Sequence, residues 1–333
     1  MDDARQYGID EPLDILVAAG GISAEREVSL QSGRAVAEAL ETRGHRVRLA
    51  DINPLHTEPL DDPAIDVVFI AMHGAFGEDG GMQQCCRDRG LAYVGSGPHA
   101  SELAMDKAAS KQAFRKAGLD TPDWVVVEEF NDAARQRQLL RAPGLPCVLK
   151  PVDGGSSVDI VIAHTAAQRA DALGDLLDKY ARALVERYVD GREFTVSVLD
   201  EQALPVMEIR VRRGFYDYTA KYEDGATEYI LDHGLDDQAS QLLKSAALTA
   251  HRALGCRDLS RTDFRVDAND RIWVLETNTI PGFTSHSLLP KAAAAAGIAF
   301  ADLCERLVGM ALQRRIAADE VLTPSPQRSR SCG

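Results

Sequence analysis

The chain has 333 residues, of which 45% are hydrophobic and 26% are charged, so it can bury large cores in two or three domains. Its formal net charge of −14 argues against a nucleic-acid or anionic-membrane surface, and an anionic ligand would need a local basic pocket. No apolar run approaches the roughly 18 to 20 residues that span a bilayer, and the acidic start of the chain is unlike a signal peptide. We therefore expect a cytoplasmic protein without nucleic-acid or membrane partners.

The first part of the chain alternates strands, glycine turns and a helix. Residues 14–19 and 65–71 are short apolar runs followed by glycines, as buried strands are, and residues 27–40 carry apolar side chains at helical spacing. This alternation predicts a parallel sheet with covering helices, in an N-terminal α/β domain of residues 1–103.

The opening turn of that first helix holds two carboxylates, Glu25 and Glu27, where the positive end of the helix dipole favours them. One interpretation is a capping arrangement, with Ser23 as the N-cap and Glu27 in the first turn. Both uses are compatible if Glu27 is structural and Glu25 points into a cleft to bind an ammonium group.

The middle of the chain predicts a smaller α+β domain over residues 104–193. It consists of a lysine-rich helix and three strands, at residues 106–117, 124–127, 146–150 and 183–189. The third region, residues 194–320, has strands, a helix and a hairpin, at residues 194–199, 204–211, 238–253 and 261–278. The tail, residues 321–333, has little apolar content and is expected to be disordered.

A glycine-rich turn, Gly154-Gly155-Ser156-Ser157, follows a strand that ends at Lys150. Glycines there allow backbone amides to approach a phosphate, although a flexible surface turn has the same composition. The turn matches neither a P-loop nor a dinucleotide fingerprint. Positive charge for an anion is available from four lysines, Lys107, Lys111, Lys150 and Lys221. Glu186 and Glu193 flank a strand end, at a spacing that reaches the base and the ribose of a nucleotide.

The hairpin near the end of the chain suits a metal ion. Glu276 and Asn278 stand two residues apart on an apolar strand, so their side chains share one face. Asp263, on the partner strand, adds a third oxygen donor beside Arg261. Carboxylate and amide oxygens suit Mg²⁺, whereas the alternative is an acidic hairpin end with solvated side chains.

These segments together resemble the D-alanine–D-alanine ligases, a family of the ATP-grasp superfamily. The similarity is colinear over nearly the whole chain, and it is carried by residues 20–30, 73–80, 95–97, 105–107, 155–158, 215–222, 261–264 and 276–287. It implies a three-domain ATP-grasp fold whose N-terminal domain has a parallel sheet. It also implies an enzyme that joins two D-alanine molecules through a D-alanyl phosphate and releases ADP and phosphate, for peptidoglycan synthesis.

The same resemblance implies ATP as co-substrate, two Mg²⁺ ions for which Mn²⁺ can substitute, and a homodimer. The ATP-binding residues would be Lys107, Lys150, Ser156, Ser157, Glu186, Val189, Glu193, Lys221 and Asn278. The metal ligands would be Asp263, Glu276 and Asn278. The substrate-binding residues would be Glu25, His73, Tyr222, Arg261, Gly282 and Ser287. The catalytic residues would be Glu25, Ser156, Tyr222, Arg261, Gly282 and Ser287.

Two positions depart from the family pattern. Asp159 stands where the family has glycine after the phosphate loop, and residues 229–234 replace a proline-containing segment beyond the mobile loop of roughly residues 205–225. Tyr222 favours D-alanine over D-lactate as the second substrate. The alternatives are a ligase of the same mechanism with another acceptor, such as D-lactate or a different D-amino acid, and an inactive nucleotide-binding relative.

Overall fold

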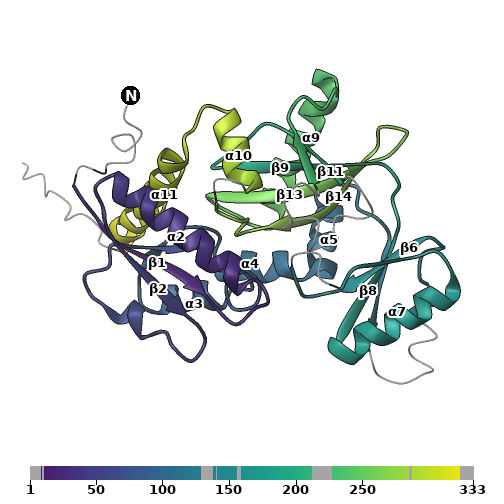
Figure 1. Ribbon diagram of the computed structural model, residues 1–333, viewed down its shortest axis with the longest axis horizontal. Helices are drawn as coiled ribbons and strands as arrows, with labels where there is room; N and C mark the ends of the chain where they lie inside the picture. The colour runs from purple at the N-terminus through teal and green to yellow at the C-terminus, as the bar shows by residue number, and fades with distance from the viewer. Residues whose placement is uncertain are drawn as a thin grey trace, which may run out of the picture.

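A computed structural model describes residue 9 and residues 11–128, 138–139, 141–155, 159–211, 227–284 and 287–322, the last of these with side chains as far as residue 315. The chain forms three sheets, each with its own helices, as Figure 1 shows. The mixed α/β class expected from the sequence is confirmed. No helix in the described part of the chain has the length and apolarity that a membrane span requires.

The N-terminal sheet is parallel, with strand order β2-β1-β3-β4. Its strands are β1 (Asp14–Gly20), β2 (Arg46–Ile52), β3 (Val67–Ile70) and β4 (Ala92–Tyr93). The associated helices are α2 (Arg26–Thr42), η1 (Glu58–Asp61), α3 (Gly81–Asp88) and α4 (Pro98–Met105). Strands β1 and β3 are buried throughout most of their length, because helices cover the sheet, and this explains their continuous apolar sequence. The predicted parallel sheet is confirmed.

The central sheet is antiparallel, with order β5-β8-β6-β7. Its strands are β5 (Trp124–Glu128), β6 (Cys147–Pro151), β7 (Val161–Ala163) and β8 (Arg182–Arg187). Helix α5 (Lys107–Lys116) leads into it, and α7 (Ala166–Lys179) covers one face with Leu173 and Leu176. Helix α7 begins with a capping box in which Thr165 and Gln168 satisfy each other's backbone amides.

The C-terminal sheet has order β12-β11-β9-β13-β14, with β10 paired to β9. Its strands are β9 (Arg192–Leu199), β10 (Gln202–Ala203), β11 (Met207–Val211), β12 (Thr227–Ile230), β13 (Leu259–Val266) and β14 (Ile272–Asn278). The single strand expected over residues 204–211 was wrong at its start, since β11 begins at Met207. Pro205 lies two residues before Met207, and it has no amide hydrogen to donate to a neighbouring strand.

Helix α9 (Asp237–Ala253) covers the C-terminal sheet, and α10 (Leu288–Ala295) follows β14. The last helix, α11 (Phe300–Leu322), returns to the N-terminal sheet and packs on α2, β3 and β4. Figure 1 shows this yellow helix beside the purple start of the chain. The two ends of the sequence therefore share one core, which includes Val36, Phe69 and Leu307. The predicted tail lies outside the described residues from residue 323 onward.

Candidate active site

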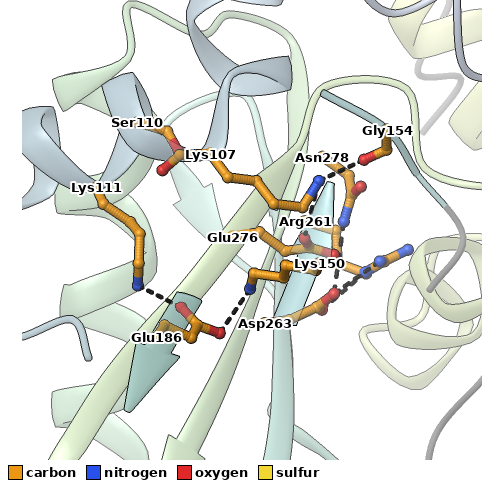
Figure 2. A network of polar contacts seen from close by, with 10 residues as sticks. All are labelled: Lys107, Ser110, Lys111, Lys150, Gly154, Glu186, Arg261, Asp263, Glu276 and Asn278. Atoms are coloured by element: carbon orange, nitrogen blue, oxygen red, sulfur yellow. Dashed lines mark hydrogen bonds and ion pairs between the residues drawn. The ribbon is translucent and has the colours of Figure 1, made fainter. Parts of the chain in front are cut away.

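The hairpin of β13 and β14 brings four polar side chains together. Arg261 pairs with Asn278 and Asp263 pairs with Glu276 across this antiparallel ladder, which has a bulge after Asp263. Directly opposed residues share a face of the sheet. Figure 2 shows the four side chains gathered on one side of the hairpin, where they face Lys107 and Lys150. The period-two spacing in the sequence predicted this arrangement.

Asp263 is held by three partners. Arg261 donates to it through Nε at 3.0 Å and Nη2 at 2.8 Å, Thr195 donates from its hydroxyl at 2.7 Å, and Asn278 Nδ2 lies 3.5 Å from Oδ2. The two carboxylates and the amide on this face provide oxygen donors of the kind that Mg²⁺ takes. Among the described residues, no group of three or more His, Cys, Asp or Glu side chains is arranged to hold a metal.

Two buried lysines approach this face from the central region. Lys107, at the first position of α5, donates to the carbonyl of Gly154 and lies 3.9 Å from Glu276 Oε2. Burial lowers the pKa of Lys107. Lys150 projects from β6, and its Nζ lies 2.7 Å from Glu186 Oε1. Together the two lysines provide, beside the hairpin, the local positive charge that an anionic ligand needs.

A pocket lies between the central and C-terminal sheets. Its apolar walls include Val148, Ile160, Val189 and Leu275, and its polar lining includes Lys150, Glu186, Glu193, Asp263 and Glu276. Glu193 pairs with Arg265 at 2.9 Å, close to the pocket. Apolar walls with a few polar groups at one end fit a planar base that carries a phosphate chain.

Glu186 is the carboxylate at the centre of this region. Lys150 lies 2.7 Å from Oε1 and Lys111 lies 2.9 Å from Oε2. Burial by itself would raise the pKa of Glu186, but the two ammonium groups outweigh it and lower the pKa to about 2. The sequence indicated a contact with a nucleotide base for Glu186 and did not indicate this double ion pair.

Glu25 approaches the glycine-rich turn from the N-terminal domain. Its carboxylate lies against two glycines, since a Cβ on Gly155 would be 2.9 Å from Oε2 and a Cβ on Gly74 would be 3.1 Å from it. The expectation that Ser23 is the N-cap was wrong, because α2 begins at Arg26 and Glu25 is the N-cap residue. The Ser23 hydroxyl instead donates to the carbonyl of His73 and accepts the amide of Glu25.

His73 connects the N-terminal sheet to the loop after β14. Its Nδ1 lies 3.1 Å from the carbonyl of Ile280, and its Nε2 lies 3.3 Å from the hydroxyl of Ser32. Burial lowers the pKa of His73, so the ring is neutral near pH 7. The Ser32 hydroxyl also accepts the amide of Phe283. Both ring nitrogens thus contact protein groups that hold the loop containing Gly282.

Gly282 and Ser287 lie close together in that loop. A Cβ on Gly282 would lie 3.0 Å from Ser287 Oγ, and this hydroxyl accepts the amide of Thr284 at 3.1 Å. A side chain at position 282 would therefore displace the Ser287 hydroxyl by a few tenths of an ångström. Four predicted site residues, Ser156, Ser157, Lys221 and Tyr222, lie outside the described residues, as does most of the predicted mobile loop.

Two buried residues near the site were not predicted. Glu78 lines a hollow with Lys107, Gly155 and Asn278 and accepts the amide of Gly74 at 2.8 Å, and burial raises its pKa to about 8. The other is Thr195, which contacts Asp263. Glu78 belongs to the segment 73–80 that carried the resemblance, so a signal for it was present. Thr195 has no distinguishing local sequence.

Asp159 turned out to be paired within the central domain. Its backbone is left-handed, with φ of 57°, and its carboxylate accepts from Lys179 Nζ at 2.9 Å and from the Tyr180 hydroxyl at 2.8 Å. These two hydrogen bonds lower the pKa of Asp159. Aspartate tolerates the left-handed conformation better than most residues, which explains how it replaces the glycine that the family pattern has here.

Comparison with known proteins identifies relatives of the whole chain. The family model for the D-ala D-ala ligase C-terminus matches residues 113–309. A D-alanine–D-alanine ligase of Synechococcus sp. (strain JA-3-3Ab) is 44% identical over 322 residues, which covers 95% of this chain and 99% of the relative. A D-alanine–D-alanine ligase of Gloeobacter violaceus is 44% identical over 300 residues, which covers 90% of this chain and 99% of the relative.

Solved structures are similar over nearly the same extent. The D-alanine–D-alanine ligase from Bacillus anthracis complexed with ATP has a TM-score of 0.80 and 31% identity, and the match covers 93% of this chain and 100% of that one. The VanG D-Ala:D-Ser ligase from Enterococcus faecalis has a TM-score of 0.80 and 28% identity, with coverage of 90% and 100%.

Proposed function

The chain belongs to the D-alanine–D-alanine ligase family, and from this premise we propose which of its residues carry each step of the reaction. The fold is the ATP-grasp fold, and the protein is an ADP-forming ligase that joins two D-alanine molecules with ATP as co-substrate, for peptidoglycan synthesis. One observation carries the assignment of residues: Lys107, Gly155, Glu276 and Asn278 line one hollow, and Glu276 also lines the pocket with Lys150 and Asp263. Glu25 from the N-terminal domain lies against Gly155.

ATP would bind between the central and C-terminal sheets. Its base would lie against Val189 and the other apolar walls of the pocket, near Glu186, and Glu193 would contact the ribose. This pose directs the phosphates toward Lys107 and Lys150, whose buried ammonium groups balance phosphate charge. Ser156, Ser157 and Lys221 would complete the phosphate contacts.

The oxygens of Asp263, Glu276 and Asn278 fit Mg²⁺ or Mn²⁺, and two such ions would neutralise the phosphoryl group during transfer. Arg261 keeps the Asp263 carboxylate in place through two parallel hydrogen bonds. The same contact orients the Arg261 guanidinium toward the reacting centre.

The first D-alanine would bind with its ammonium group on Glu25. A carboxylate is a poor acyl donor, because its leaving group would be oxide, so the reaction needs a D-alanyl phosphate. The amine of the second D-alanine then attacks the carbonyl carbon of that intermediate, and phosphate leaves. Arg261 and the amide of Gly282 would stabilise the negative charge on the tetrahedral oxygen.

The second D-alanine would bind with its carboxylate near Ser287 and Arg261. We propose that His73 acts on this substrate by holding the Ile280–Phe283 segment in position, since both its ring nitrogens contact protein groups. Tyr222 and Ser156, together with Glu25, would form the hydrogen-bonded triad that closes the site. Closure excludes water, which would hydrolyse the acyl phosphate.

The remaining parts of the proposal concern organisation. We propose domain boundaries near residues 103 and 193, with α11 completing the core of the first domain. A homodimer formed through the first domain and a cytoplasmic location, where ATP and D-alanine are available, complete the proposal. D-Alanine, rather than D-lactate, is proposed as the preferred acceptor.

A coupled phosphate-release assay with a panel of D-amino acids and D-lactate tests the assignment. Wild-type protein should release phosphate only when ATP, Mg²⁺ and D-alanine are all present. Glu276→Ala should lower kcat by at least roughly a thousandfold, because transfer then lacks a metal ligand. An equal rate with Glu276→Ala would refute the metal assignment. A D-lactyl product in excess would refute the acceptor preference.

A further inference from the structure

Lys111 is a buried cation to which the proposed reaction gives no role. It lies on α5 one helical turn after Lys107, and its side chain is fully buried. Its Nζ lies 2.9 Å from Glu186 Oε2 and donates to the Thr121 hydroxyl at 2.6 Å. Figure 2 shows Lys111 and Lys150 on opposite sides of the Glu186 carboxylate. A buried lysine is retained only where its charge is compensated, so Lys111 and Glu186 depend on each other.

The three side chains form a charged row from three elements: α5, β8 and β6. Glu186 is 3% exposed and Lys150 is 4% exposed, so little water screens the row. Two ammonium groups and one carboxylate give it a net charge of +1. Without Lys111, Glu186 and Lys150 would form a neutral pair, and Lys150 would present less positive potential to a phosphate.

Lys111 also connects the row to the metal-binding hairpin. The Thr121 hydroxyl that accepts from Lys111 donates to the carbonyl of Val274 at 2.8 Å. Val274 lies on β14, two residues before Glu276. The Lys111 ammonium group thus contacts β8 directly, through Glu186. It contacts β14, the strand of Glu276, through the Thr121 hydroxyl.

We propose that Lys111 is a positioning residue for ATP: by sharing the charge of Glu186, it leaves Lys150 with net positive charge for the phosphates and aligns the two walls of the nucleotide cleft. This inference rests on the proposed roles of Lys150 and Glu186 in ATP binding. Lys111 does not itself contact the substrate in this proposal.

The environment of Lys111 makes its charge sensitive to pH. The charged groups that act on it are Glu186 on β8, Lys150 on β6 and Arg115 on its own helix, and it lies 5.3 Å from the ring centre of Trp124 on β5. Burial lowers its pKa to about 8, although Glu186 opposes this shift. As the pH rises through 8, Lys111 loses its proton. The negative charge of Glu186 is then compensated by Lys150 alone. ATP binding should therefore weaken above pH 8.

The test measures KM for ATP and for D-alanine in four proteins: wild type, Lys111→Met, Glu186→Gln and the double variant. Lys111→Met should raise KM for ATP at least tenfold and change KM for D-alanine by less than threefold. In the Glu186→Gln background, the same substitution should change KM for ATP by less than threefold, because no carboxylate remains to neutralise Lys150. An equal loss in both backgrounds would overturn the proposal.

A pH profile tests the inference with the positive charge at position 111 retained. Between pH 7.5 and 9, KM for ATP should rise in wild type and stay constant in Lys111→Arg, whose guanidinium keeps its charge. Parallel profiles of the two proteins would overturn the proposal, even if Lys111→Met does not fold. Failure of the proposed function is recognised separately, since wild type would then release no phosphate in response to D-alanine.

Discussion

Replacing Gly155 with alanine should disturb the first substrate without unfolding the protein. The new Cβ would lie 2.9 Å from Glu25 Oε2, whereas ordinary contacts begin at 3.4 Å. The backbone of Gly155 is not left-handed, so alanine is compatible with its conformation. The clash involves the far end of a flexible side chain, and the Glu25 carboxylate relieves it by moving away about half an ångström.

That movement is large for a carboxylate that we propose to bind an ammonium group. Site groups work within roughly 0.5 Å of their productive positions, and a hydrogen bond to a charged group contributes about 1.5–3 kcal/mol. If half of that contribution is lost, KM for the first D-alanine should rise by roughly four- to twelvefold. KM for ATP should change less than about threefold, because the proposed base and ribose contacts lie elsewhere.

Initial-rate measurements with both substrates varied would check this prediction, with thermal melting to monitor the fold. Gly174→Ala is the matched control, since a Cβ there meets nothing within 4 Å and α7 gains about 1 kcal/mol from the substitution. The reasoning is refuted if Gly155→Ala leaves the D-alanine kinetics unchanged, or if Gly174→Ala alters them equally.

Three further substitutions give distinct outcomes. Thr195→Val removes one hydrogen bond from Asp263 and should lower kcat by roughly tenfold with little change in melting temperature; unchanged kcat contradicts the supporting role. Asp159→Gly removes an ion pair with the exposed Lys179, so KM for ATP should rise less than about fivefold; a larger rise in steady-state assays would contradict a minor role for this pair. Asp258→Asn removes a negative charge that Arg314 and the backbone amide of Gly95 contact. The free energy of unfolding in urea should fall by about 1.5–3 kcal/mol, and a fall below about 0.5 kcal/mol contradicts this.

The local pattern of the chain was sufficient to predict the arrangement of side chains on the hairpin of β13 and β14. Glu276 and Asn278 share a face because side chains alternate along a strand, and the short connection to Asp263 makes the two strands antiparallel neighbours. The first sheet was predictable for a similar reason, since apolar runs that end at glycine specify buried parallel strands. The alternation of side chains along a strand depends only on neighbouring residues, so it is visible in the amino-acid sequence.

The buried charges could not be predicted in this way. Lys111, Lys150 and Glu186 come from three elements, and no local pattern shows that packing brings the three charges together away from water. Helix α11 is a second case, because its apolar residues show that it is buried and do not show against which sheet.

The sequence by itself determined which side chains share a strand face and predicted helices over residues 27–40, 106–117 and 238–253, because backbone geometry relates neighbouring residues at fixed periods. Only the tertiary structure decided that Lys111 and Lys150 meet on one carboxylate and that Glu25 lies against Gly155. Such contacts depend on how separate elements pack, and packing also decides which charges lose their water and so depend on one another.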